Sequence, residues 1–280
     1  MGRDSSWLIG SDLIAIFLAL AGQIVLTKAL LTESYGIYII ALDAFATFFL
    51  IIDLGLPTLI ARDGANDVGK IWPSIYRVYK LQLLCSIPFI LLAVIGTPLL
   101  IDNWKEYFEL IVICGAIALV HIASYAPRSG LRAAGQARLE AWSKVIERVV
   151  TVTGYFVLYS LGSTSVTAFA TVFLIGAIGG LVIALGLSYS ILPKVSFSEI
   201  NDWSDLGDSW IDNKTLLLQA LPFAITLGVL PYVIRIEKFI VAGEIGVDAA
   251  AVFHVAQLAW LAGLVAVSYT HLTLPTILLV

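Results

Sequence analysis

The chain has 280 residues, of which 60% are hydrophobic and 13% are charged, and its mean hydropathy is +0.96. This is more apolar surface than the core of a water-soluble protein can hide, so the composition predicts a membrane protein. The net charge of −4 and the pI near 5.3 argue against a nucleic-acid partner, because no basic region is present to neutralise phosphates.

Apolar stretches recur along the whole chain and predict about eight membrane-spanning α-helices. Hydrocarbon requires every backbone amide to be bonded within the crossing segment, and about 20 apolar residues are needed to cross it as a helix. In chain order the predicted spans are residues 13–31, 36–60, 81–101, 108–126, 145–161, 166–192, 216–234 and 249–267. The fifth span is the weakest, because Glu147 and Arg148 lie near its start.

The distribution of Lys and Arg predicts the orientation of these spans. With a cytoplasmic N-terminus, most of the 16 basic residues fall in the inner connections. The outer side then holds Lys28, Lys105, Arg235 and Lys238. An excess of Lys and Arg is typical of the cytoplasmic connections of a multi-pass protein of the plasma membrane.

The second predicted span contains two carboxylates, Asp43 and Asp53. An ionisable side chain in hydrocarbon is costly unless it is paired or faces water, so each has a functional and a structural interpretation. Asp43 either pairs with Lys28 or couples transport to a proton or cation. Pro57 predicts a kink at Asp53, which then binds a cation or proton, caps the broken helix or pairs with Arg62.

The longest connection, residues 193–215, has acidic side chains at every third position and an apolar stripe. The acids are Glu199, Asp202, Asp205 and Asp208, and the stripe is formed by Ile200, Trp203 and Trp210. This pattern predicts an amphipathic helix at the membrane interface, with its tryptophans at the depth of the lipid headgroups. It serves as a linker or, alternatively, as a regulatory or partner-binding segment.

Basic residues end the seventh predicted span. Arg235 and Lys238 either extend their side chains to the membrane surface or bind a phosphate, for which the guanidinium group of Arg is well suited. The lone histidines His121 and His254 are interpreted as core residues with satisfied hydrogen bonds, and the small residues at 176–180 as a site of close helix packing.

Motifs of metalloproteases, nucleotide-binding loops and serine hydrolases are missing from the sequence, which predicts neither an enzyme nor a cofactor or metal site. The last residues, 267–280, read VSYTHLTLPTILLV and resemble a translated sequencing adapter. We therefore expect a non-native tail and a chain that is truncated at its C-terminal end.

Several local motifs resemble one family of membrane proteins. They are Glu-Ser-Tyr-Gly-Ile-Tyr at 33–38, Asp-Leu-Gly-Leu-Pro at 53–57 with Arg62 after it, Leu-Pro-Phe at 221–223 and Arg-Ile-Glu-Lys-Phe-Ile-Val-Ala-Gly at 235–243. The chain from Trp7 to Ala266 thereby resembles the lipid-linked oligosaccharide flippases, or polysaccharide exporters. These belong to the multidrug/oligosaccharidyl-lipid/polysaccharide exporter superfamily.

The resemblance implies an all-α fold of two six-helix bundles that face each other across a central cavity and work by alternating access. Residues 1–193 would form the first bundle, 194–215 an amphipathic cytoplasmic linker and 216–266 the start of the second bundle. The implied partners are membrane lipid, a polyprenyl-pyrophosphate glycan and a coupling H⁺ or Na⁺. The candidate residues for the lipid phosphate are Lys28, Arg128, Arg235 and Lys238, and those for the coupling ion are Asp43 and Asp53.

The function implied is the flipping or export of a lipid-linked oligosaccharide or polysaccharide precursor across the plasma membrane. A cation-coupled antiporter of drugs or organic cations is the alternative within transport, and the two carboxylates suit a cationic substrate equally well. A membrane-embedded glycan polymerase or ligase is the alternative among enzymes. It would require a large outer loop with catalytic residues, whereas the predicted outer connections are short.

Overall fold

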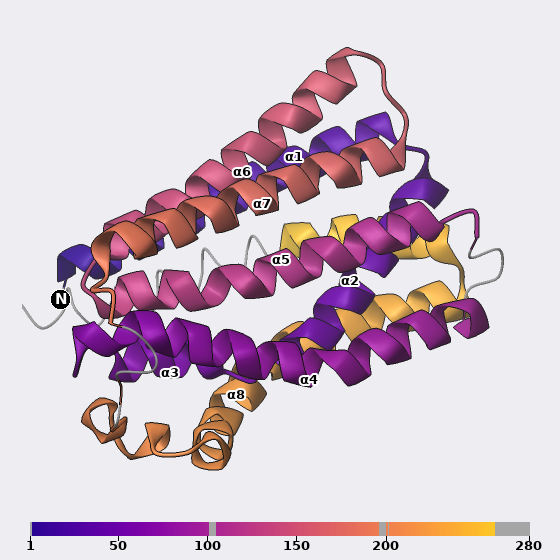
Figure 1. Cartoon of the computed structure of the whole chain (residues 1–280). Helices are drawn as coiled ribbons and strands as arrows, with labels where there is room; N and C mark the ends of the chain where they lie inside the picture. The colour runs from indigo at the N-terminus through magenta and orange to yellow at the C-terminus, as the bar shows by residue number, and fades with distance from the viewer. Residues whose placement is uncertain (1, 101–104, 196–199, 201, 261–280) are drawn as a thin grey trace, which may run out of the picture.

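The structure is a computed structural model that describes residues 2–100, 105–195, 200 and 202–260 (Figure 1). Within these ranges the regular elements are all helices. The long ones are α1 (Gly2–Ala29), α2 (Thr32–Asp53), α3 (Leu56–Asp63), α4 (Ile71–Leu100), α5 (Phe108–Ala133), α6 (Ala137–Ser160), α7 (Val166–Ile191), α8 (Asn213–Glu244) and a final helix, Val247–Trp260. Three short 3₁₀ turns are η1 (Val68–Lys70), η3 (Ser204–Leu206) and η4 (Asp208–Trp210).

Each predicted span overlaps one of these helices over the part that is described, except the second, which covers α2 and most of α3. Three segments are long and apolar enough to cross a membrane: Trp7–Ala29, Phe108–Ala133 and Val166–Ile191. The two halves of α8, Asn213–Thr226 and Pro231–Glu244, meet at an angle of 58° and together would make a fourth. Pro231 explains a bend there, because proline removes a helical hydrogen bond. The chain is therefore an all-α, polytopic membrane protein, while the count of eight spans stays a prediction.

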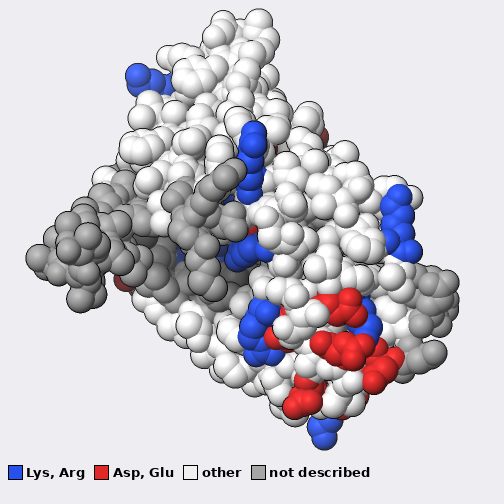
Figure 2. Space-filling model, turned by 90° about the vertical axis from the view of Figure 1, so that its left-hand side faces the viewer, with Lys and Arg blue, Asp and Glu red and all other residues white. Residues whose placement is uncertain are grey.

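The helices run back and forth between two ends of one bundle. At one end in Figure 1 lie the N-terminus, the α5–α6 turn and the turns η3 and η4, and at the other lie the α1–α2 and α6–α7 connections. These are the two groups of connections that the sequence assigns to opposite sides of the membrane. Figure 2 views the end that carries the N-terminus, where Lys and Arg side chains lie at several places and acidic side chains gather in one area.

The second predicted span is broken rather than kinked. Leu54 and Gly55 both have left-handed backbone conformations, with φ of 52° and 68°, and Pro57 lies in the first turn of α3. Gly55 also faces α8, where an added Cβ would lie 2.7 Å from the carbonyl oxygen of Ala220. A side chain at this position would therefore strain the backbone and collide with α8.

Helices α6 and α7 pack closely through glycine, as the small residues at 176–180 predict. A Cβ on Gly176 would lie 2.0 Å from Thr151 Oγ1, and one on Gly180 would lie 2.5 Å from Glu147 Oε2. Small residues allow two helices to approach to this distance in a membrane, where packing rather than the hydrophobic effect drives their association. This prediction is confirmed.

The connection between α7 and α8 differs from the sequence prediction. In its described part, residues 202–212, the chain forms η3 and η4 instead of one amphipathic helix, and Gly207 at φ 124° separates the two turns. Trp210 is fully buried in the protein and its ring stacks on Trp203, at 6.2 Å between centroids. The prediction of one amphipathic helix is thus wrong for 202–212, and Glu199 lies outside the described residues.

Polar contacts explain why this connection folds onto the bundle. Trp210 Nε1 donates to Asp63 Oδ2 at 2.9 Å, and Arg77 Nη1 donates to the carbonyl oxygen of Trp210 at 2.7 Å. Lys70 Nζ donates to the carbonyl oxygen of Asp202 at 2.8 Å and pairs with Asp205. A buried indole N–H needs a hydrogen-bond partner, and this end of α3 and α4 supplies one.

Candidate functional site

A cavity of about 340 Å³ lies between α2, α5, α6, α7 and α8. Five of its lining residues are acidic or basic: Asp43, Asp53, His121, Arg148 and Arg235. The others are Leu42, Ala46, Ile117, Ala118, Ile122, Tyr125, Phe173 and Pro231. Ionisable side chains inside a membrane protein typically face one another or a water-filled cavity and mark the path of a substrate or ion. This cavity is therefore the candidate functional site.

Asp43 connects α2 to α8. Its Oδ1 lies 3.4 Å from Arg235 Nε, and its Oδ2 pairs with Lys238 Nζ. Lys28, which the sequence offers as a partner for Asp43, is exposed in the last turn of α1. The structure thus brings together three predicted site residues, Asp43, Arg235 and Lys238, and leaves Lys28 outside the cavity lining.

Lys238 lies behind the cavity wall and is only 3% exposed. Its Nζ is 3.2 Å from Nδ1 of His254 on the final helix, whereas Nε2 of His254 is buried without a hydrogen-bond partner among the described residues. The prediction of a core histidine with satisfied hydrogen bonds thus holds for only one of its ring nitrogens. Gln257, one turn further on, donates to the carbonyl oxygen of Ile234 at 3.0 Å and to Glu237 at 3.2 Å. The second half of α8 therefore makes polar contacts with α2 on one side and with the final helix on the other.

Asp53 lies at the end of α2, where the helix breaks. Gln82 of α4 donates to its Oδ1 at 3.3 Å, and the backbone N–H of Gly55 also donates to its carboxylate. Arg62 does not pair with it but donates to Asp63 Oδ2 at 2.8 Å and to Ser209 at 2.7 Å. Of the structural interpretations, capping of the broken helix agrees with these contacts, and pairing with Arg62 is wrong.

Arg128 is buried between α5 and α6. Its Nη2 pairs with Glu147 Oε2 at 2.6 Å, and its Nε donates to Ser143 at 3.2 Å. The other oxygen of Glu147 lies 2.8 Å from His121 Nε2, which gives His121 the polar partner that was predicted. Arg128 is thus used in a buried contact between two helices and is not among the residues that line the cavity.

Arg148 lines the cavity although the sequence places it at the cytoplasmic start of a span. The helix α6 begins at Ala137, eight residues before the predicted span, so that Arg148 lies near the middle of the helix. Its guanidinium carbon is 5.6 Å from the ring centre of Phe173 in α7. If the predicted span is extended back to the turn at Gly135, Arg148 falls inside the helix and is recognised as a basic residue within the bundle.

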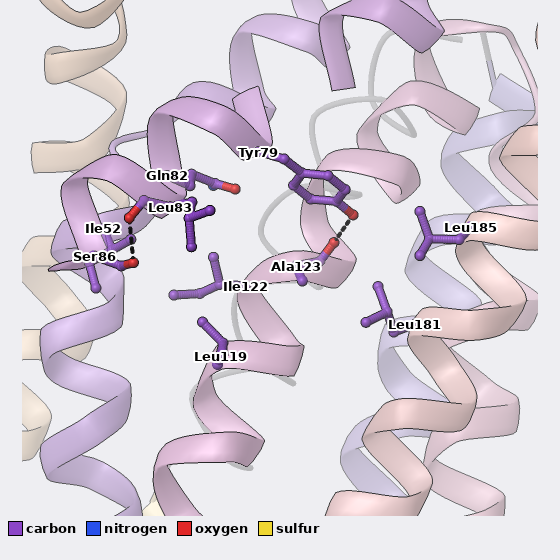
Figure 3. A pocket seen from close by; sticks show the side chains of 10 residues that line it. All are labelled: Ile52, Tyr79, Gln82, Leu83, Ser86, Leu119, Ile122, Ala123, Leu181 and Leu185. Carbon is purple, nitrogen blue, oxygen red and sulfur yellow. Dashed lines mark hydrogen bonds between the residues drawn. The ribbon is translucent and has the colours of Figure 1, made fainter. Parts of the chain in front are cut away.

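A second pocket, of about 320 Å³, is almost entirely apolar (Figure 3). It lies between α2, α4, α5 and α7, and its lining includes Ile52, Leu83, Leu119, Leu181 and Leu185. The two hydroxyl groups in its lining already have partners within the protein, since Tyr79 donates to the carbonyl oxygen of Ala123 and Ser86 donates to that of Leu83. Ile122 of α5 lines both this pocket and the polar cavity.

Comparison with known proteins gives one result for the family. No match is found among curated proteins, and none among solved structures. The profile of a family described as polysaccharide biosynthesis protein matches residues 1–270, which confirms the predicted resemblance to polysaccharide exporters. With its membrane-spanning helices and a match over almost its whole length, the chain belongs to the polysaccharide biosynthesis protein family.

Proposed function

We propose that the chain moves a lipid-linked glycan precursor across the plasma membrane by alternating access, and that the polar cavity is part of the path. The observation that carries the proposal is the pair of arginines, Arg148 and Arg235, on the wall of a cavity inside an apolar bundle. Family membership supports a cargo from polysaccharide biosynthesis. In this proposal the chain acts as a transporter and not as an enzyme.

The chemistry of the cavity suits the headgroup of such a lipid. A guanidinium group offers several N–H donors in one plane and binds phosphate oxygens in pairs. Arg148 projects from α6 and Arg235 from α8, which belong to the first and second predicted bundles, so that a bound anion would contact both. We retain Lys238 as part of this site, and Asp43 and Asp53 as candidates for a coupling H⁺ or Na⁺. Roles for Lys28 and Arg128 in substrate binding remain predictions.

An antiporter of organic cations is the second candidate within transport, because Asp43 and Asp53 both line the cavity. The contacts of Asp43 favour an anionic cargo, since this carboxylate is already paired with Arg235 and Lys238. The proposed orientation, with a cytoplasmic N-terminus, rests on the larger number of Lys and Arg residues in the connections of that side.

Transport in vesicles tests the proposal directly. The chain is reconstituted with a fluorescent polyprenyl-pyrophosphate disaccharide, and movement between leaflets is followed with a quencher that does not cross the membrane. We expect faster movement than in protein-free vesicles, and loss of this activity on Arg235→Glu but not on Lys105→Glu, which changes an exposed residue between α4 and α5. Movement equal to that in protein-free vesicles, together with uptake of a fluorescent organic cation, would support the antiporter instead.

A further inference from the structure

We propose that Asp43 is a built-in counter-ion that occupies an anion site formed by Arg235 and Lys238, and that a pyrophosphate group replaces it there. This inference rests on the proposed function in so far as the cargo is anionic. In this inference Asp43 competes with the substrate for the anion site and does not couple transport to an ion.

The charges around Asp43 are unbalanced. Two cations, Arg235 and Lys238, face this one carboxylate, and their ion pairs within the described chain are both with Asp43. Glu237, the nearest acid in sequence, is exposed and accepts from Gln257 instead. Because the Lys238 side chain is only 4% exposed, water does little to offset the excess positive charge. A site with one buried cation, one half-buried cation and a single carboxylate favours the binding of a further anion.

Arg235 has hydrogen-bonding capacity that Asp43 does not use. Its Nε faces Asp43 Oδ1, while its Nη1 is buried and has no hydrogen-bond partner among the described residues. A buried donor without a partner costs free energy, which an incoming phosphate oxygen would recover. A pyrophosphate carries more oxygens and more negative charge than a carboxylate, so one of its oxygens can bond to Nη1 while others face the remaining N–H groups of the guanidinium.

The site is open to the cavity on the side where Asp43 and Arg235 line it, and Arg148 also lines this cavity. An anion in the cavity can therefore reach Arg235 without passing Lys238. The exchange would have a mechanical consequence, because the pairs from Asp43 join α2 to the second half of α8. When pyrophosphate takes the place of Asp43, this link between the two predicted bundles is lost, while the link at Trp210 remains.

The binding of inorganic pyrophosphate to the detergent-solubilised chain tests the inference without any transport. Removal of the competing carboxylate by Asp43→Asn should tighten binding by about tenfold or more, the factor that one charge-assisted hydrogen bond contributes. Asp53→Asn is the matched control, since it removes a carboxylate from the same helix and the same cavity. Addition of Arg235→Gln to Asp43→Asn should abolish the gain.

Equal affinity of the wild type and Asp43→Asn, or an equal gain from Asp53→Asn, would overturn the inference. If Asp43→Asn does not fold, Lys238→Gln in the wild-type chain removes the second cation and leaves Asp43 paired with Arg235 alone, and it should weaken pyrophosphate binding by about tenfold or more. Unchanged binding in Lys238→Gln would also overturn the inference. Competition by polyprenyl pyrophosphate would identify the lipid headgroup as the ligand, and its failure would identify a free anion. If Asp43→Asn binds pyrophosphate more tightly but the chain does not move the lipid-linked probe, the anion site stands and the proposed function is wrong.

Discussion

Trp210 and Asp63 are joined by a hydrogen bond of 2.9 Å from the indole Nε1 to Oδ2, although 146 residues separate them in the chain. The bond fixes η4, the turn just before α8, to the end of α3. Trp210 is fully buried there, among apolar residues of α3, α4 and α8. The turns before α8 thus attach the second predicted bundle to the first at the end of the molecule that carries the N-terminus.

Substitution of Trp210 should therefore destabilise the whole chain. We expect Trp210→Ala to lower the free energy of unfolding by about 3–5 kcal/mol, the usual cost of removing a large buried aromatic side chain. Thermal unfolding in detergent measures the effect. Trp142→Ala is the control, because Trp142 is 46% exposed on α6. Similar losses in both variants would contradict the buried position of Trp210.

Glu147 should be essential for stability because it neutralises Arg128. Glu147→Ala leaves the buried guanidinium without its partner, at an expected cost of about 3–5 kcal/mol in the free energy of unfolding. The double variant Arg128→Met/Glu147→Leu should recover most of this loss, since it removes both charges. Chemical unfolding measures both values, and Glu106→Ala, at an exposed residue, serves as the control. A double variant less stable than Glu147→Ala would argue against the pairing.

The packing of α7 on α6 gives a prediction with a control in the same helix. Gly176→Ala should destabilise the chain by about 1–3 kcal/mol, because the new methyl group would overlap Thr151 Oγ1. Gly179→Ala should be neutral or stabilising, since a Cβ there meets no atom within 4 Å. The melting temperatures of the two variants, measured side by side, test the helix face. The opposite order would mean that α7 presents a different face to α6.

Acid should weaken the start of α8. Hydrogen bonds from the backbone N–H and the hydroxyl of Thr215 lower the pKa of Asp212, which caps this helix. The cap therefore contributes stability above the ordinary Asp pKa of about 4 and loses it as the pH falls through the lowered value in the folded state. The difference in melting temperature between the wild type and Asp212→Ala should shrink in acid. A difference that grows in acid would contradict this sign.

Some of the fold follows from the sequence for clear physical reasons. The positions of the spans depend on local apolar length, and the break after Asp53 depends on the local effect of Pro57 and Gly55. The pairing of Asp43 with α8 is different, because nothing within α2 indicates that residues 192 and 195 positions later, Arg235 and Lys238, will approach it. The sequence offered Lys28 as a partner because that residue is close in the chain.

The candidate cavity was predictable only in part. Asp43, Asp53 and Arg235 are conspicuous as charges in apolar helices, and all three line it. Arg148 was placed outside because the polar first turns of α6, with Arg138, Glu140 and Lys144, hide the true start of the helix. Trp210 was assigned to the membrane surface because an amphipathic pattern does not reveal whether lipid or protein covers its apolar side.

Transport of the lipid-linked probe by Arg148→Gln is the most direct test of the central claim, that a glycan lipid passes through the polar cavity. The matched control is Arg138→Gln, which removes an exposed arginine from the same helix, α6. We predict that Arg148→Gln slows movement of the fluorescent polyprenyl-pyrophosphate disaccharide by about tenfold or more, whereas Arg138→Gln leaves the rate unchanged. Equal rates in Arg148→Gln and the wild type would contradict the account.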